Sequence, residues 1–339
     1  MRIGILGPVA WRIPPRKYGG WENVTYLLAE GLVKRGYDVT LFATADSVTS
    51  AKLESIVPRP LEEDSSLPPR VYETLHIVNA YEKAKNFDIL HNNIGVYGTV
   101  LSKLSPIPVL TTLHGSAAEP DSRIIYTRYR NHPYVSISNA ERRICPELNY
   151  ISTVYNGIDI ASAPEPTTPE DYLLFVGRLS PDKGIHNAIK VSLATGRRLI
   201  IAGIIPKANE EYYEKEISRY IDGRNIIYIG PVDPVNRNRL MNKAYALLHL
   251  VEYEEAFGLT MAEAMATGCP VIGNNRGSVP EVVKHGETGF VVNTLNEAIE
   301  AIDKVKFIDR KKCREWVNQR FSADQMVSGY IEVYQRLLG

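Results

Sequence analysis

Two carboxylates, Glu255 and Glu263, stand eight positions apart around the pair Phe257-Gly258. In one continuous helix they would be separated by roughly 12 Å along the axis, so a single pocket could use both only if Glu255 lay in a loop folding back over the helix start. Gly258 permits such a turn. A helix beginning there would direct its free N–H groups and positive dipole end at the space beneath Glu255, which suits a phosphate. The segment predicts a place where an anion and a polyhydroxylated group meet.

A second segment, residues 177–184, carries the cations Arg178 and Lys183 between an apolar strand and the next helix. At the carboxyl end of a strand, such a turn offers a diphosphate both charge and N–H donors. A surface loop with two solvated cations is the alternative for this segment alone. Because the Glu255 segment should lie at the same sheet edge, we favour the diphosphate site.

The first half of the chain has weaker candidates. Gly19 and Gly20 precede a helix, where paired glycines let the backbone approach a ligand closely; a flexible turn is the alternative. His114 ends an apolar strand and so can face a ligand, although a lone histidine is more often a local hydrogen-bonding group. His91 ends another strand and has the same two interpretations.

Several cofactor motifs are absent from the sequence. There is no Gly-x-Gly-x-x-Gly and no Gly-Lys-Ser/Thr, which disfavours a dinucleotide cofactor and a Walker-type site. No Asp-x-Asp triplet of the kind used at metal-bound diphosphate sites occurs, and no histidine pair has helical metal spacing. We therefore expect no cofactor and no metal, so the charge on a leaving diphosphate would be met by Arg178, Lys183 and helix N-termini.

The composition of the chain argues against several other classes of protein. The chain has 339 residues, 44% of them apolar and 23% charged, and a net charge of zero, so bulk electrostatics give no reason to expect a nucleic-acid partner. Three widely spaced cysteines without a Cys-x-x-Cys pair indicate neither a disulfide framework nor a thiolate zinc site, which favours the cytoplasm. The apolar runs are far shorter than the roughly 20 residues of a membrane span, and Pro8 makes a signal peptide unexpected.

One stretch, from Arg123 to Arg143, is rich in arginine and tyrosine. Its basic members are Arg123, Arg128, Arg130, Arg142 and Arg143. A solvated face is the simpler interpretation. A weak peripheral contact with an anionic membrane surface, or with an anionic acceptor, is the alternative.

Short β-branched runs alternate with amphipathic segments throughout, which predicts an α/β protein with parallel sheets. Expected strands are 2–6, 39–43, 89–91, 109–113, 134–137, 151–154, 172–176, 199–202, 226–229, 246–249 and 270–272. Expected helices are 22–34, 71–85, 96–104, 183–194, 210–221, 237–242 and 259–267. Ligands would bind at the carboxyl ends of such strands.

Two Rossmann-like doubly wound domains, facing across a cleft, are the simplest architecture for this length. Residues 159–171 lack an apolar period and look like a linker. The final helix would start at Ser322, with Gln325 completing a capping box. Its apolar face is formed by Met326, Tyr330, Val333, Tyr334, Leu337 and Leu338. We expect residues 1–158 with helix 322–339 to form the first domain, and residues 159–321 the second.

Taken together, these motifs resemble the retaining GT-B glycosyltransferases of family 4 over nearly the whole chain. Glu-x7-Glu with its internal Phe-Gly is Glu255 to Glu263, Gly-Arg-Leu with Lys-Gly is residues 177–179 and 183–184, and His-Gly is residues 114–115. The interdomain Asn-Gly-Val-Asp is similar to residues 156–159, with Tyr155 where proline is usual. Residues 277–281 and 286–290 resemble the helix and turn that follow the glutamate motif.

The resemblance implies sugar transfer from a nucleotide-diphosphate sugar, most readily a UDP- or GDP-sugar, to an acceptor hydroxyl with retained anomeric configuration. It implies that the second domain holds the donor and the first the acceptor. By the same resemblance Glu263 binds the ribose, and Arg178 and Lys183 hold the diphosphate. Glu255 and the backbone of Phe257, Gly258 and Leu259 fix the donor sugar.

The resemblance also places His114 near that sugar and backbone around Val232 at the base. Residues Gly19 and Gly20 match its glycine loop. We expect Glu255 to bind the sugar without forming a covalent bond, and the leaving phosphate oxygen to accept the acceptor's proton.

Two alternatives remain. A nucleotide-sugar 2-epimerase of the same fold would depend on carboxylates for elimination at the sugar, and the spacings around Arg178 and Glu255 argue against it. A non-catalytic sugar-nucleotide-binding subunit would be marked by a lost phosphate cation, and neither Arg178 nor Lys183 is missing.

Overall fold

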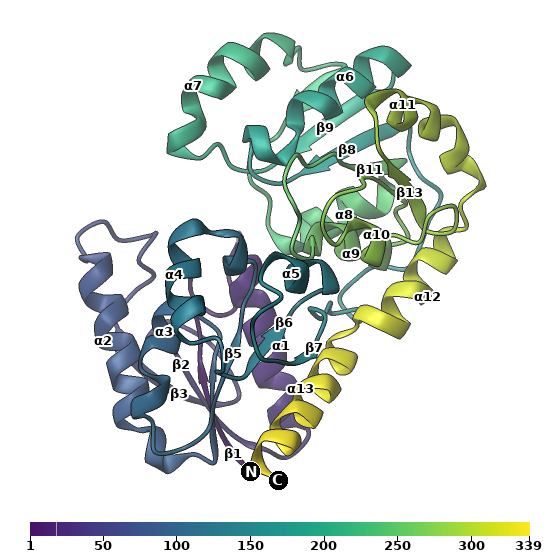
Figure 1. Cartoon of the computed structure of the whole chain (residues 1–339). Helices are drawn as coiled ribbons and strands as arrows, with labels where there is room; N and C mark the ends of the chain where they lie inside the picture. The colour runs from purple at the N-terminus through teal and green to yellow at the C-terminus, as the bar shows by residue number, and fades with distance from the viewer. Residues whose placement is uncertain (18) are drawn as a thin grey trace. The chain divides into compact units, whose positions relative to one another are not determined.

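The computed structural model describes residues 1–17 and 19–339, and they divide into two compact units. The first unit consists of Met1–Gly157 and Ser322–Gly339, and the second of Ile158–Phe321. Each is a parallel sheet flanked by helices, as the α/β pattern predicts (Figure 1). Residue 18, in the predicted loop 11–20, and the side chain of residue 116 lie outside the described part.

The first unit contains a seven-stranded parallel sheet in the order β3-β2-β1-β4-β5-β6-β7. Its strands are β1 Arg2–Leu6, β2 Asp38–Thr44, β3 Lys52–Val57, β4 Ile89–Asn92, β5 Val109–Thr112, β6 Tyr134–Ser136 and β7 Tyr150–Thr153. Its helices are α1 Gly20–Lys34, α2 Pro69–Glu82, α3 Val96–Val100, α4 Pro120–Arg128, α5 Asn139–Ile144 and α13 Ala323–Leu338. The strand order reverses between β1 and β4, so a crevice for ligands is expected at their carboxyl ends.

The second unit repeats this plan with six strands in the order β10-β9-β8-β11-β12-β13. They are β8 Tyr172–Val176, β9 Arg198–Ala202, β10 Ile226–Tyr228, β11 Ala246–His249, β12 Val271–Asn274 and β13 Gly289–Val292. Its helices are α6 Ile185–Thr195, α7 Glu210–Tyr212, α8 Pro234–Lys243, α9 Leu259–Ala266, α10 Val279–Val282, α11 Leu295–Lys304 and α12 Arg310–Phe321. Here the order reverses between β8 and β11.

The predicted strands are confirmed to within a residue or two, because central parallel strands are buried on both faces and read as continuous apolar runs. Strand β3 went unpredicted because it lies at the sheet edge with only its last residue buried. The expected helix 210–221 is irregular, since α7 continues as a π-turn over Tyr213–Ile217 and a 3-10 turn over Ser218–Tyr220. The helices α4, α5, α11 and α12 and strand β13 were also missed.

The last helix, α13, packs on the first unit beside α1 (Figure 1). Ser322 caps it by accepting a hydrogen bond from the Gln325 N–H, which confirms the predicted start. Met326, Tyr330 and Tyr334 of its expected apolar face are buried. Leu338 is 41% exposed, so the buried face ends before the last turn of the helix, contrary to expectation.

A buried polar network joins α13 to the sheet. The His91 ring contacts the Tyr334 hydroxyl at 2.7 Å through Nδ1 and the Thr112 hydroxyl at 2.8 Å through Nε2. Thr112 in turn lies 3.0 Å from the Tyr330 hydroxyl. Burial, with a smaller contribution from His114, lowers the pKa of His91 to about 3. His91 therefore belongs to the packing of the final helix, which is the simpler of its two interpretations.

We predict that His91 makes the fold sensitive to acid. Its pKa in the folded chain lies below the ordinary value of 6.5, so between those two values the unfolded chain binds the extra proton. The free energy of unfolding should fall as the pH drops from about 6.5 towards 3, by up to about 1.4 kcal/mol per pH unit from this group. His91→Gln keeps a donor and an acceptor but does not titrate, so urea unfolding of the variant should give a shallower pH profile. Parallel profiles for the two proteins would contradict the assignment.

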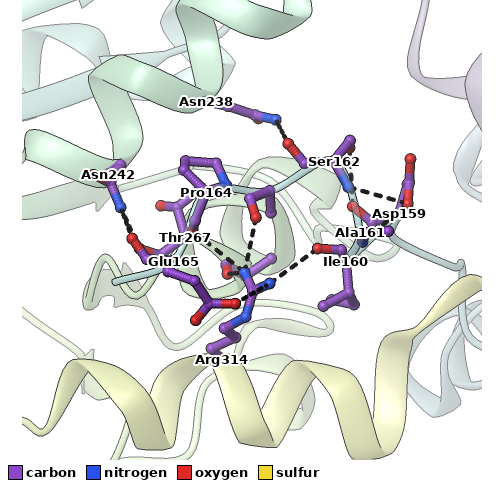
Figure 2. A network of polar contacts seen from close by, with 12 residues as sticks. Asp159, Ile160, Ala161, Ser162, Pro164, Glu165, Asn238, Asn242, Thr267 and Arg314 are labelled. Atoms are coloured by element: carbon purple, nitrogen blue, oxygen red, sulfur yellow. Dashed lines mark hydrogen bonds and ion pairs between the residues drawn. The ribbon is translucent and has the colours of Figure 1, made fainter. Parts of the chain in front are cut away.

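The segment after Gly157 is held against the second unit by Arg314 of α12 (Figure 2). The Arg314 guanidinium donates to the carbonyls of Ile160, Ala163 and Ala266 at 3.2, 3.1 and 2.7 Å. It also pairs with Glu165 at 3.0 Å. Asn242 adds hydrogen bonds to the carbonyls of Glu165 and Thr267. The expected linker is therefore fixed at its second-unit end, despite a sequence without apolar period.

None of the helices in the described residues is both long enough and apolar enough to cross a lipid bilayer.

Candidate functional site

The two predicted anion-binding segments meet at one edge of the second sheet. Arg178 and Lys183 follow β8, and Glu255 follows β11. The two strands are neighbours, with Leu173 opposite Ala246 and Leu174 opposite Leu247. Since both run in the same direction, their carboxyl ends lie together. The expectation that these segments share a sheet edge is confirmed.

Glu255 is the centre of a compact polar cluster. Its side chain is 8% exposed, and its oxygen Oε2 is close to two nitrogen atoms: Lys183 Nζ lies 3.3 Å away and His249 Nε2 3.2 Å away. The Tyr253 hydroxyl donates a hydrogen bond to the same oxygen. Lys183 also donates to the Tyr253 hydroxyl and sits over its ring, 4.6 Å from the centroid. A buried carboxylate is therefore surrounded by one cation and two further polar groups.

These contacts keep Glu255 ionised. Burial by itself raises the pKa of the carboxyl group, but Lys183, His249 and Tyr253 together outweigh it and lower the pKa well below its usual range. The negative charge is thus stable at any physiological pH. An ionised carboxylate accepts hydrogen bonds and donates none, so it is suited to orient hydroxyl groups.

Two glycines in left-handed conformations set the path of the loop that carries Glu255. Gly258 has a φ of 76° and immediately precedes α9, as the fold-back prediction requires. Gly277 has a φ of 57°, and a Cβ there would lie 2.2 Å from the carbonyl oxygen of Glu255. The next residue, Ser278, donates its N–H to that same carbonyl at 2.8 Å. The residues after β12 therefore pack against the backbone of the Glu255 loop and stabilise it.

Gly277→Ala should consequently disrupt the site, whereas Gly286→Ala provides a matched control. Gly286 is also left-handed, with a φ of 78°, but a Cβ there meets nothing within 4 Å. The control should lose about 1–2 kcal/mol of unfolding free energy from backbone strain, and Gly277→Ala at least about 3 kcal/mol. Urea denaturation measures both. Equal losses would show that the close approach to Glu255 is unimportant.

Glu263, the second carboxylate of the motif, lies on α9. Its Oε1 pairs with Arg237 Nη2 of α8 at 2.7 Å, and its side chain is 10% exposed. Burial raises the pKa of Glu263, and Arg237 opposes the shift. Arg237 lies on α8, and Asp233 caps the start of this helix. Val232, which is half-buried, comes immediately before the cap. Glu263 and the segment expected at the base are thus joined through Arg237.

The remaining predicted residues of this unit occupy different environments. Arg178 forms an ion pair with Asp182 at 3.4 Å, but its side chain is 43% exposed, so part of the guanidinium is open to a ligand. Phe257 is buried and packs edge to face on Phe321, with ring centroids 5.6 Å apart. Its side chain therefore anchors the loop, which leaves the backbone of residues 257–259 as the part that can bind. Leu259 is the first residue of α9.

Sequence reasoning missed three residues of this site: His249, Tyr253 and Arg237. A signal existed for His249, because it is the last residue of β11 and so stands at the carboxyl edge. Tyr253 lies only two residues before Glu255, but nothing in the spacing predicts that its hydroxyl turns towards the carboxylate. Arg237 is one of several cations on a polar helix, and only its contact with Glu263 distinguishes it.

The first unit gathers its candidates at the carboxyl edge of β1, β4 and β5. Gly19, with a φ of 141°, caps α1, and Gly20 is the first residue of that helix. A Cβ on Gly19 would lie 2.7 Å from Pro15, so the turn depends on glycine. Trp21 lies against His114, with ring centroids 5.4 Å apart. The structure therefore brings the glycine pair and His114 together, although they are about 95 positions apart in the chain.

His114 is held by a buried neighbour. Its Nε2 lies 2.9 Å from the Asn93 Oδ1, and Asn93 follows β4. Since the amide oxygen accepts, Nε2 carries the proton and Nδ1 remains the acceptor of the neutral ring. Burial lowers the pKa of His114 to about 3, so the ring is neutral at physiological pH. His114 also has a φ of 51°, the left-handed region that a bulky residue rarely adopts.

Glu141 supports this strained turn. It is fully buried, and its carboxylate accepts hydrogen bonds from the N–H groups of Gly115 and Ile137. Burial raises the pKa of Glu141 to about 7, against the opposing effect of those two donors. Glu22, at the start of α1, is similarly buried and has its pKa raised to about 7. The sequence did not predict either carboxyl group, because only burial in the fold distinguishes them from other glutamates.

Two doubly wound units with a cation–carboxylate cluster at the second sheet are the arrangement expected of a GT-B glycosyltransferase, and comparison with known proteins agrees. Residues 159–320 match the family of glycosyl transferases group 1, and residues 18–162 match Glycosyltransferase Family 4. These matches together span nearly the whole chain. The chain belongs to the group 1, family 4 glycosyltransferases and is an enzyme of that kind.

Individual relatives are distant. An uncharacterized 41.2 kDa protein in the cps region of Klebsiella pneumoniae is 32% identical over 169 residues, covering 48% of this chain and 46% of that protein. The N-acetyl-alpha-D-glucosaminyl L-malate synthase of Bacillus anthracis is 25% identical, covering 75% of this chain and 76% of that one. A structure of HepE from Anabaena in complex with UDP and glucose is 21% identical, with a TM-score of 0.75 over 99% and 100% of the two chains. That likeness concerns the fold.

Proposed function

We propose that this protein transfers a sugar from a nucleotide-diphosphate sugar, a UDP-sugar first and a GDP-sugar second, to an acceptor hydroxyl with retention of configuration. The observation that carries the proposal is the ionised Glu255, held by Lys183, His249 and Tyr253 between the starts of α6 and α9. Such a cluster offers a hydroxylated ring a fixed acceptor and a diphosphate a nearby cation. Synthesis of glycans, glycolipids or glycoconjugates is the setting in which we place it.

The donor would be bound by its three parts. Arg178, Lys183 and the helix starts at α6 and α9 would meet the diphosphate, because they combine positive charge with free N–H groups. Glu263, oriented by Arg237, would accept from the ribose hydroxyls, and backbone near Val232 would contact the base. Glu255 and the backbone of residues 257–259 would fix the sugar. The structure of HepE with UDP and glucose, on the same fold, supports UDP as the first nucleotide to test.

Sugar transfer without a covalent glycosyl-enzyme intermediate is the mechanism we propose for these side chains. Attack by the acceptor on the same face as the leaving diphosphate breaks the bond from the anomeric carbon to the phosphate oxygen, forms the new glycosidic bond, and passes the acceptor's proton to that oxygen. Glu255 remains a binding group, since Oε2 already accepts from its neighbours. In the first unit, Gly19, Gly20 and the neutral His114 would contact the sugar substrates. No metal takes part, because cations of the chain itself meet the developing charge.

A panel of UDP- and GDP-sugars tests the proposal. The matching nucleotide diphosphate should raise the melting temperature, since saturation at 100 times the dissociation constant adds about 2.7 kcal/mol of stability. The matching sugar nucleotide should release its nucleotide diphosphate slowly with water as acceptor, and equally well in EDTA. A nucleoside without phosphates serves as the control ligand. An epimerised donor with no transfer would overturn the proposal, and so would binding of every donor without any turnover.

We place this activity in the cytoplasm. All three cysteines are buried free thiols, which supports a reducing compartment.

A further inference from the structure

A hollow in the first unit lies at the opposite edge of its sheet from His114. It is an open pocket of about 630 Å³ beside the starts of β5 and β6, lined by residues 102–103, 107–109 and 127–133. His114 follows the other end of β5. We call this hollow the basic pocket, because Lys103, Arg128 and Arg130 line it and no carboxylate does.

The structure sorts the arginines of the segment 123–143 into paired and unpaired groups. Arg123 pairs with Glu147 at 3.6 Å, and Arg142 stacks over the Tyr150 ring at 4.9 Å. Within the described residues, no carboxylate lies at ion-pair distance from Arg128, Arg130 or Lys103. The positive charge of Arg128 interacts favourably with the negative end of the α4 helix dipole, because Arg128 lies in the last turn. That explanation does not extend to Arg130 or to Lys103. Lys103 lies over the Tyr129 ring, 5.3 Å from its centroid, so among the described residues Arg128 and Arg130 are the two cations of the pocket without an ion pair or a ring contact.

Exposed apolar side chains flank these cations. Leu104, next to Lys103, is 79% exposed, and Ile124, one turn before Arg128 on α4, is 73% exposed. Positions four apart on a helix share a face, so Ile124 and Arg128 lie on the same side. Tyr97, which is 66% exposed, lies at the start of the neighbouring helix α3, after the carboxyl end of β4, and so is not part of this surface. Both helices are seen in the first unit in Figure 1.

We infer that this surface docks on an anionic lipid bilayer. The basic pocket would take the phosphate of a lipid headgroup, while Leu104 and Ile124 enter the boundary between headgroups and acyl chains. Cations beside exposed apolar side chains are the combination that binds membrane interfaces, whereas a site for a free anion has no use for the apolar rim. The carboxyl edge with His114 stays uncovered. This inference goes beyond the proposed function and does not depend on it.

Sedimentation of the full chain with vesicles tests the inference. We expect binding to vesicles of phosphatidylcholine with phosphatidylglycerol, no binding to phosphatidylcholine alone, and weaker binding at higher salt. The double variant Arg128→Ala/Arg130→Ala should bind about 30-fold less tightly. Leu104→Ser/Ile124→Ser should also weaken binding, although the charge is unchanged. Thermal melts should match the wild type for both variants.

A matched control removes the same charge elsewhere. Lys311 and Lys312 are exposed neighbours on α12 in the second unit, and Lys311→Ala/Lys312→Ala should bind vesicles like the wild type. Equal loss in this control, or failure of the wild type to bind anionic vesicles, would overturn the inference. A melting-temperature rise with inorganic phosphate that needs Arg128 and Arg130, without vesicle binding, would also overturn it. Binding of UDP should be unchanged in the pocket variants, so failure of the donor proposal would be seen separately.

Discussion

Lys183→Ala should reduce turnover by roughly two to three orders of magnitude, the effect of losing one preorganised group at a site of developing charge. The structure gives this residue a second task, because its Nζ lies 3.3 Å from the buried Glu255. Without it the pKa of Glu255 should rise, and the chain should lose about 1–3 kcal/mol of unfolding free energy. Steady-state kinetics and urea denaturation of the variant measure the two effects.

A double variant separates the two tasks of Lys183. In Lys183→Ala/Glu255→Gln the buried charge is removed together with its partner, so most of the lost stability should return while turnover stays low. Lys190→Ala removes an exposed cation on α6, the helix that follows Lys183, and should change neither property. If the double variant regained wild-type turnover, Lys183 would serve only to neutralise Glu255, and its diphosphate role would be wrong.

Glu263→Gln should weaken binding of UDP by about 10- to 100-fold, since hydrogen bonds to a charged group contribute about 1.5–3 kcal/mol. The amide keeps the shape of the side chain beside Arg237, which limits the effect on folding. Isothermal titration would measure the dissociation constant of the free nucleotide diphosphate. Glu300→Gln, on an exposed part of α11, is the control and should bind UDP normally.

Deoxy nucleotides turn this into a test of the ribose contact itself. The wild type should bind 2′-deoxy- or 3′-deoxy-UDP more weakly than UDP, whereas Glu263→Gln should lose little further affinity with the ligand that lacks the contacted hydroxyl. The same loss in both proteins would contradict the ribose role, because independent effects add.

The sequence alone predicted which segments meet at the candidate site, and the reason is geometric. Segments that follow neighbouring parallel strands must meet, so Arg178, Lys183 and Glu255 could be brought together without a structure. The strands themselves were visible because burial on both faces produces continuous apolar runs. Edge strand β3 and the short helices α4 and α5 lacked that signal, since partial burial and polar composition interrupt their patterns.

The support around the site could not be predicted. Tyr253 and His249 reach Glu255 only because the loop turns at Gly258 and is backed by Gly277, which comes from beyond the next strand. Likewise, the strained His114 is fixed by Asn93 and Glu141, which lie 21 and 27 positions away in sequence. Contacts of this kind depend on exact loop paths, and residue spacing does not encode them.

The sequence by itself determined the fold class and the family resemblance, and it supplied the candidate residues for a nucleotide-sugar site, because periodicity and motif spacing are local properties of the chain. Only the tertiary structure decided that Glu255 is an ionised and buried group, that Glu263 is joined to Arg237, and that two arginines of the basic segment share a pocket with Lys103. Burial and pairing of charges set those outcomes, and both arise from residues that are distant in the chain and adjacent in the fold.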